Sequence, residues 1–186
     1  MGTLIVRAIV LLAFPLVVFI GVGYLMQRLS DPSKLRAKLD IPGLGLRRTG
    51  YNLEEVKTYW TALEAGDALG AEQRMLEMDL VFPFIYGAAF AGTLLCAWAA
   101  LDRTFHPALI LTPVFVEVVA DWIENSIQLK QIRLFAANAA GLQEGWIQIA
   151  SLATIVKCWL FIVSYILVIG MVGWMVYKNW PRSSAR

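Results

Sequence analysis

Four apolar stretches of about 20 residues limit the folds open to this sequence more than any other feature. They fall at about residues 4–26, 80–101, 108–129 and 149–177. Each is long enough to cross a hydrocarbon layer of roughly 30 Å as a helix. The composition agrees, because 59% hydrophobic and 16% charged residues lie outside the usual range of soluble domains. We therefore predict one all-α domain over residues 1–186, an integral membrane four-helix bundle.

A long polar segment, residues 27–79, separates the first two apolar stretches. Within it, Asn52 followed by Glu55 fits a capping box, and apolar residues then recur at helical spacing. The pattern predicts a short amphipathic helix over about residues 53–65. We favour a helix packed over the end of the bundle; the alternative is a helix on the membrane surface. A further helix should then run into the second apolar stretch, with a kink at Pro83.

The basic residues give an expected orientation. Four crossings would place both termini on one side of the membrane and the long polar segment on the other. Lysine and arginine near the ends of the spans slightly favour the side of the long segment, and the positive-inside rule places that side in the cytoplasm. We expect a multi-pass protein of a bacterial inner (plasma) membrane. The residues compared are Arg28, Lys34, Arg36, Lys38, Arg74, Lys130 and Arg133 against Arg7, Arg103, Lys178, Arg182 and Arg186.

The third apolar stretch carries the most informative polar residues. Three carboxylates and two amides recur at steps of four, three, four and three, which places them on one arc of a helix with Asn125 at its edge. A charged side chain in the middle of a membrane costs about 2.5 to 3.5 kcal/mol on insertion scales, so such residues face a bundle interior or a wet cavity. We expect this arc to point inward. Its members are Glu117, Asp121, Glu124, Gln128 and Gln131.

The fourth stretch supplies an amine, Lys157, with Thr154 on nearly the same helix face. If the third and fourth helices form a hairpin turning near Ala140, Glu124 and Lys157 are almost equidistant from the turn, and Asp121 is within one turn of that level. We predict an ion pair between Lys157 and Glu124 or Asp121. One lysine cannot neutralise three acids. At least one carboxyl group should therefore be protonated, hydrogen-bonded to a neutral partner or waiting for a cation.

The second stretch adds Asp79 and Tyr86, seven residues apart on one helix face. Polar residues that lack a charge are commonly explained as contacts between membrane helices, whereas ionisable residues are an expensive way to hold helices together and favour a function. The candidate catalytic residues are Glu124, Asp121, Glu117 and Lys157. The candidate ligand-binding residues are Asp79, Tyr86, Asn125, Gln128 and Thr154.

Other classes of site have less support. The formal charge of +2, from 16 basic and 14 acidic residues, gives no basic face for nucleic acid. Cys96 and Cys158 lie in different spans without C-x-x-C spacing, so neither a zinc knuckle nor a redox pair is indicated. The single histidine, His106, lies far in depth from the acids, which excludes a histidine-rich iron or zinc centre. An all-carboxylate site for Mg²⁺ or Mn²⁺ is an alternative with weak support, and we predict no metal and no cofactor.

Three functions suit this pattern. A carboxyl group among apolar walls can donate a proton near neutral pH, so the first is an intramembrane protein that binds or converts a hydrophobic, lipid-like or isoprenoid-like small molecule. In helix number and buried acids, the predicted architecture resembles the four-helix sterol isomerase and sigma-2 receptor class, an analogy of architecture. The second function is a proton or cation relay in a homo-oligomer. The third is an accessory or assembly subunit whose acids pair with another membrane protein. Membrane lipid is an expected partner in each case.

Overall fold

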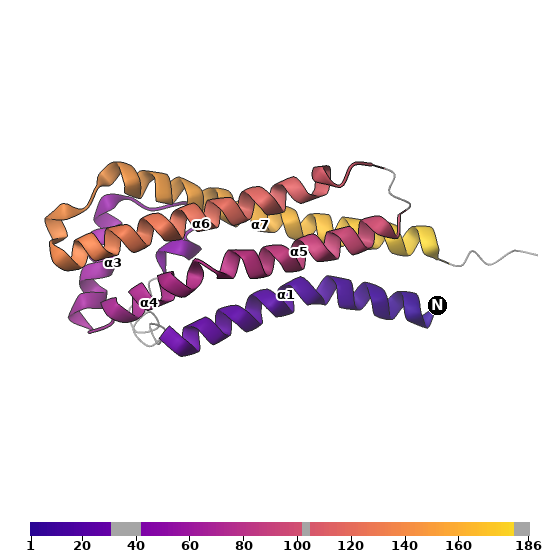
Figure 1. Ribbon diagram of the computed structural model, residues 1–186, viewed down its shortest axis with the longest axis horizontal. Coiled ribbons are helices and arrows are strands. Elements are labelled where there is room, and N and C mark those ends of the chain that lie inside the picture. Colours follow the sequence, from indigo (N-terminus) through magenta and orange to yellow (C-terminus); the bar gives the residue numbers. More distant parts are fainter. Residues whose placement is uncertain (31–41, 102–104, 181–186) are drawn as a thin grey trace, which may run out of the picture.

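The computed structural model describes residues 1–30, 42–101 and 105–180 (Figure 1). All regular structure in these ranges is helical, so the prediction of an all-α fold is confirmed. Several basic residues used to predict the orientation lie outside the described residues, namely Lys34, Arg36, Lys38, Arg103, Arg182 and Arg186.

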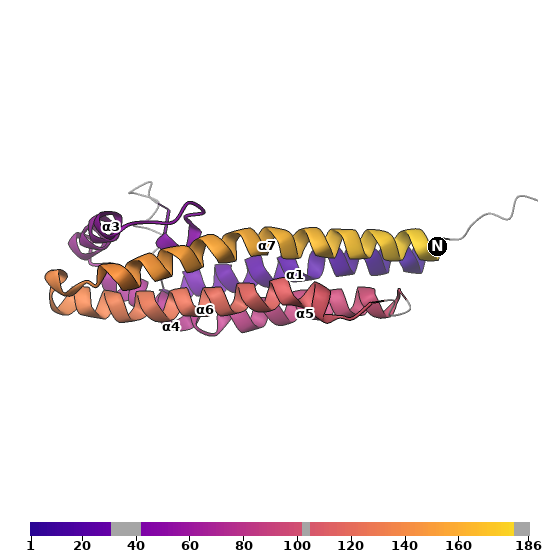
Figure 2. The same cartoon turned by 90° about the horizontal axis from the view of Figure 1, so that it is seen from above.

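Four long helices run side by side along the molecule (Figures 1 and 2). They are α1 (Gly2–Ser30), α5 (Phe82–Ala99), α6 (Ala108–Ala137) and α7 (Glu144–Asn179). The helices α6 and α7 form a hairpin and pack along most of their length, and α1 contacts both α5 and α7. The turn of this hairpin contains a short 3₁₀ helix, η2 (Ala139–Gly141). We call this end of the molecule the hairpin end; the N-terminus lies at the other end (Figure 1).

Length and composition would allow three helical stretches of the described chain to cross a membrane. They are α1, the stretch Leu69–Ala99 and α7. The helix α6 is long enough at 30 residues, but it carries Glu117, Asp121 and Glu124 close together, which lowers its apolar character. Three of the four predicted spans thus contain an apolar segment long enough to cross a membrane, and α6 is the exception.

The start of the second apolar stretch differs from the expected kinked helix. The helix α4 (Leu69–Asp79) ends before α5 begins, and Pro83 lies in the first turn of α5. Proline has no N–H, so it cannot donate to the carbonyl oxygen of Asp79 four residues earlier. That oxygen instead accepts a hydrogen bond from Asn125 Nδ2 at 3.0 Å. The expected kink at Pro83 is therefore a break between two helices, and the freed carbonyl ties α4 to α6.

The helix α3 (Leu53–Ala65) lies near the hairpin end (Figure 1). Both hydrogen bonds of the predicted capping box are present, from Glu55 N to Asn52 Oδ1 at 2.9 Å and from Asn52 N to Glu55 Oε2 at 2.8 Å. The apolar face of α3 is buried against α6 and α7, as expected for a helix packed over the bundle. The buried apolar residues at this contact, which we call the α3 cluster, include Val56, Tyr59, Trp60, Leu63, Leu129, Ile132, Phe135 and Ile147.

A second apolar cluster fills the space between α1, α5, α6 and α7. Phe19 of α1 stands at its edge, with ring centroids 4.6 Å from Phe161, 5.3 Å from Phe82 and 5.6 Å from Tyr86. Along α6, the buried residues of this cluster end at Val114 and those of the α3 cluster begin at Leu129. The polar arc predicted from the sequence occupies this interval from Glu117 to Gln128, whereas Gln131 lies beyond it and bonds to Gln143.

Candidate functional site

An ion cluster of one lysine and two carboxylates lies in that interval. Lys157 Nζ is 2.7 Å from Asp121 Oδ1 and 2.5 Å from Glu124 Oε2. The predicted ion pair is confirmed, and it involves both acids. The side chains are 13%, 7% and 0% exposed for Lys157, Asp121 and Glu124. Charges this deeply buried are tolerated only when their remaining lone pairs and protons find partners.

Those partners come from neighbouring helices and from the next turn of α6. Tyr86 of α5 donates from its hydroxyl to Asp121 Oδ2 at 2.9 Å. One turn further along α6, Asn125 Nδ2 donates to Asp121 Oδ1 at 3.0 Å and Gln128 Nε2 donates to Glu124 Oε1 at 2.7 Å. Gln128 of the predicted arc and Asn125 at its edge thus hold the two paired carboxylates in place.

Tyr51 is a member of the site that sequence reasoning missed. Its hydroxyl accepts hydrogen bonds from Gln128 Nε2 at 2.9 Å and from Thr154 Oγ1 at 3.4 Å. Its backbone N–H donates to Ser151 Oγ at 2.8 Å. Burial, and then the carboxylate of Glu124, raise the pKa of the Tyr51 phenol far above its usual range, so the hydroxyl keeps its proton. No periodic pattern includes Tyr51 in the sequence, and its partners lie 77 to 103 residues further along the chain.

Gly45 brings the backbone of the long segment onto the ion cluster. It lies in a short 3₁₀ helix, η1 (Leu44–Leu46). A Cβ atom placed on Gly45 would lie 3.3 Å from Lys157 Nζ and 3.4 Å from Glu124 Oε1. Larger side chains would therefore displace the paired groups. The spacing of Gly43 and Gly45 was the only sequence signal for this close approach, and it is also typical of an ordinary turn.

Glu117 is the acid that Lys157 leaves unneutralised. It is 1% exposed, and its Oε2 accepts a hydrogen bond from Ser164 Oγ at 2.8 Å. Its other oxygen, Oε1, has no hydrogen-bond partner in the described part of the chain. Of the three states expected for an acid without a cation, Glu117 has the hydrogen bond to a neutral partner, the hydroxyl of Ser164. An unpaired buried oxygen is costly and calls for an explanation.

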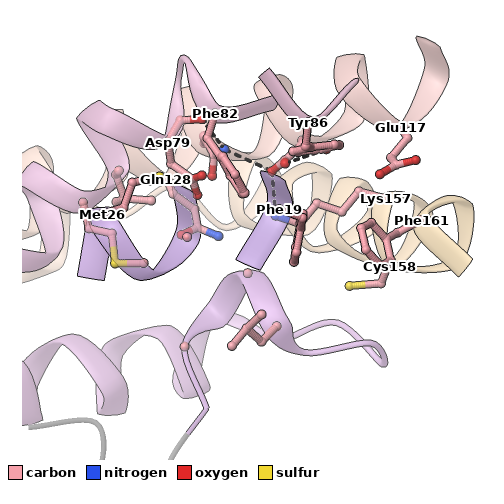
Figure 3. Close-up of a pocket in the computed structure, with 18 of the residues that line it drawn as sticks. Phe19, Met26, Asp79, Phe82, Tyr86, Glu117, Gln128, Lys157, Cys158 and Phe161 are labelled. Atoms are coloured by element: carbon pink, nitrogen blue, oxygen red, sulfur yellow. Dashed lines mark hydrogen bonds and ion pairs between the residues drawn. The ribbon is translucent and has the colours of Figure 1, made fainter. Parts of the chain in front are cut away.

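A cavity of about 440 Å³ lies beside this cluster (Figure 3). Polar side chains form one part of its wall: Asp79, Tyr86, Glu117, Asp121, Asn125, Gln128 and Lys157. Aromatic and aliphatic side chains form much of the rest, including Phe19, Met26, Phe82, Phe161 and Ile162, and the long segment contributes Gly43, Gly45, Leu46 and Arg48. In Figure 3, Asp79 and Glu117 lie to either side of Tyr86.

Two of the predicted site residues do not line this cavity. Glu124 is fully buried and contacts Lys157 and Gln128, and Thr154 bonds to Tyr51 and to the carbonyl of Ala150. Glu72 lines the cavity and was missed; it is buried and accepts from Tyr59 Oη at 3.3 Å. It lies in the short helix α4, where no periodic pattern predicted an inward-facing residue.

Cysteine and metal chemistry add no further feature. Both cysteines are free, with Cys96 exposed and Cys158 half-buried on the cavity wall. Among the residues that the structure describes, no group of three or more His, Cys, Asp or Glu side chains is arranged to hold a metal ion.

Comparisons with known proteins suggest no function for this site. No protein-family model, no curated protein and no solved structure matches this chain.

Proposed function

We propose that the protein is an integral membrane protein whose four long helices cross the membrane as a bundle. The exposed surface of α1 supports insertion, because Ile9, Val17 and Ile20 are 59%, 65% and 64% exposed. Contiguous apolar surface of this kind is rare on soluble monomers and suits contact with acyl chains. The same reasoning makes α6 the fourth crossing helix: its acids are buried, while Phe115 and Trp122 are exposed.

We further propose a bacterial inner membrane with the hairpin end in the cytoplasm. Among the described residues, Arg28, Arg74, Lys130 and Arg133 belong to the side of the hairpin end, and Arg7 and Lys178 to the other. This distribution follows the positive-inside rule.

The cavity carries the proposed activity: it binds a hydrophobic, lipid-like small molecule. A volume of about 440 Å³ is within the range of small-molecule pockets, which combine apolar walls with a few placed polar groups. Here Phe19, Phe82 and Phe161 supply the apolar contact, and Glu117 and Asp121 supply the polar wall. The decisive observation is that the buried acids border an open space instead of a packed core.

Glu117 is the best candidate for acid–base work on a bound molecule. Lys157 already holds Asp121 and Glu124, whereas Glu117 Oε1 has no partner among the described residues. A carboxyl group in this position can give or take a proton at a ligand atom within hydrogen-bond reach. The internal pairing of Lys157 also favours a ligand site over an accessory subunit, since it leaves fewer charges to pair with another protein.

The binding proposal is tested by filling the cavity from α1. Gly23 lines the cavity, and a Cβ atom there would meet nothing within 4 Å, so Gly23→Leu has room to enter it. Gly21→Leu is the matched control, because Gly21 has the same open surroundings and does not line the cavity. We expect mass spectrometry of the purified protein in mild detergent to find a retained hydrophobic molecule in the parent and in Gly21→Leu, and to find it depleted in Gly23→Leu. Equal retention in all three would contradict the proposal.

A further inference from the structure

Two carboxyl groups on the cavity wall have acceptor oxygens that nothing in the described chain satisfies. One is Glu117, whose Oε1 is unpartnered although the side chain is 1% exposed. The other is Asp79: its backbone carbonyl accepts from Asn125, but its half-buried carboxylate makes no hydrogen bond or ion pair within the described residues. Both side chains line the same cavity. A ligand that fits them must donate hydrogen bonds at two places.

The balance of charge specifies what kind of donor is needed. Lys157 faces two carboxylates, Asp121 and Glu124, so that cluster already holds one acid more than it has bases. Asp79 and Glu117 add two further acids. Arg48 is the other basic residue on the described wall, and it is exposed to solvent. Attraction between charges is strengthened in a low-dielectric interior, so ammonium groups suit these carboxylates better than hydroxyl groups.

The spacing of the two acids specifies how far apart the donors lie. Asp79 is fixed at the level of Asn125 by the hydrogen bond to its carbonyl. Glu117 and Asn125 belong to the same helix, α6, and at 1.5 Å per residue their separation along the axis is roughly 12 Å. Phe19, Phe82 and Phe161 line the cavity as well. The site therefore offers two polar ends with an apolar middle.

We propose that the ligand is a molecule with a basic nitrogen at each end of an apolar body, in the manner of a long-chain α,ω-diamine. One ammonium group binds Glu117 Oε1 and the other binds the carboxylate of Asp79, each through charge-assisted hydrogen bonds. This inference rests on the proposed binding function and narrows its ligand class. An extended chain covers about 1.2 Å per bond, so about eight methylene groups bridge the two acids and four do not.

The test measures the binding of two diamines, a monoamine and a diol to the purified full chain in detergent at neutral pH, by calorimetry. We expect 1,8-diaminooctane to bind at least tenfold more tightly than 1,4-diaminobutane, 1-aminooctane or 1,8-octanediol. Glu117→Gln and Asp79→Asn should each reduce the affinity for 1,8-diaminooctane to that for 1-aminooctane. Glu77→Gln is the matched control, because Glu77 is an exposed acid of α4 that pairs with Arg133 and does not line the cavity. It should bind like the parent.

Each remaining outcome counts against the inference. Equal affinity for the diol and the diamine overturns the requirement for charge, and equal affinity for the monoamine and the diamine overturns the second anchor. These comparisons use the unmodified protein, so they hold even if an acid variant fails to fold. If 1,8-octanediol binds and Gly23→Leu abolishes this binding, the hydrophobic pocket stands and only the diamine class fails. If none of the probes binds and no molecule is retained on purification, both proposals fail.

Discussion

At the scale of single residues, Lys157 decides which acids of the polar layer are paired with a cation and which is not. Its ammonium group contacts Asp121 and Glu124 together, which leaves Glu117 to a hydroxyl group, that of Ser164. This division explains how three carboxyl groups can share one interior. Two are stabilised as an ion cluster and the third stays available to the cavity.

Replacing Lys157 with methionine should destabilise the protein, because it leaves two buried carboxylates without their cation. Removing one partner of a buried ion pair typically costs about 3 to 5 kcal/mol, and we expect a loss of that order in the free energy of unfolding in detergent at neutral pH.

Lys130→Met is the control for this change. Lys130 is exposed and lies 5.5 Å from the centre of the Trp146 ring, a contact of about 0.5 to 1 kcal/mol. If Lys157→Met and Lys130→Met had the same stability at neutral pH, the ion cluster would not be structurally important.

The sequence predicted most polar residues of the site that lie on the long helices, together with Asp79, and missed Tyr51, Gly45 and Glu72 of the long polar segment. The spacing of Asp121 and Glu124 on one helix and of Lys157 on the next was enough to predict their contact, because helical geometry fixes both faces and the hairpin fixes the depth. Tyr51 and Gly45 reach the same cluster from a segment without periodicity. Their positions depend on tertiary contacts that no local pattern encodes.

At the scale of elements, the chain around Gly50 clamps the long segment onto α7. Gly50 has φ of +80°, a backbone conformation that disfavours side chains. A Cβ atom there would also lie 2.5 Å from Ser151 Oγ, the atom that accepts the N–H of Tyr51. The clamp therefore needs glycine for two reasons, and it positions the Tyr51 hydroxyl beside Gln128.

Gly50→Ala should destabilise the protein by about 2 to 3 kcal/mol. About 1 to 2 kcal/mol comes from the left-handed backbone, and the rest from displacing Ser151 and its buried hydrogen bond. Gly92→Ala is the control: Gly92 is an exposed residue of α5 with open space around it, so alanine should stabilise the helix by up to about 1 kcal/mol. Denaturant unfolding in detergent measures both, and equal effects would contradict the clamp.

The capping box of α3 gives a prediction confined to one element. Asn52→Ala removes the side-chain oxygen that accepts the N–H of Glu55, which typically costs about 1 kcal/mol. Faster hydrogen exchange should therefore appear in the first turn of α3, with α6 and α7 unchanged. Thr49→Ala, at an exposed position just before the helix, should leave exchange in α3 as it is. Unchanged exchange in Asn52→Ala would mean that packing alone fixes the helix start.

Element boundaries were harder to predict than element identity. The apolar runs marked the long helices, but α1, α6 and α7 extend beyond their runs, as α6 does to Ala137, whereas α5 is shorter than its run. An apolar run marks the residues whose side chains contact lipid or the core. Helical backbone continues beyond the run wherever hydrogen bonds and packing allow it. The break between α4 and α5 shows the opposite case, in which helical backbone stops within an apolar stretch. Pro83 was recognised as a disturbance, but whether it bends or ends a helix depends on Asn125, which offers the freed carbonyl of Asp79 a partner.

At the scale of the whole molecule, the central question is whether α6 crosses the membrane with the other three helices. Its buried face holds the ion cluster, and its opposite face presents Phe115 and Trp122. A helix of 30 residues is about 45 Å long, which exceeds a hydrocarbon layer of roughly 30 Å. The acids of α6 are buried on the inner face, so its outer surface does not carry the free-energy cost of charged side chains in lipid.

Single cysteines before α6, in the turn between α6 and α7, and at the end of α7 test this crossing directly. In a Cys96→Ser and Cys158→Ser background, His106→Cys, Ala140→Cys and Asn179→Cys each place a thiol at an exposed position near a helix end. We expect a membrane-impermeant maleimide to label positions 106 and 179 from outside intact cells, and position 140 only after the membrane is opened. Labelling of 106 and 140 from the same side would show that α6 does not cross. Labelling of 140 alone from outside would keep the crossings of α6 and α7 and reverse the orientation, which depends on the small bias in basic residues.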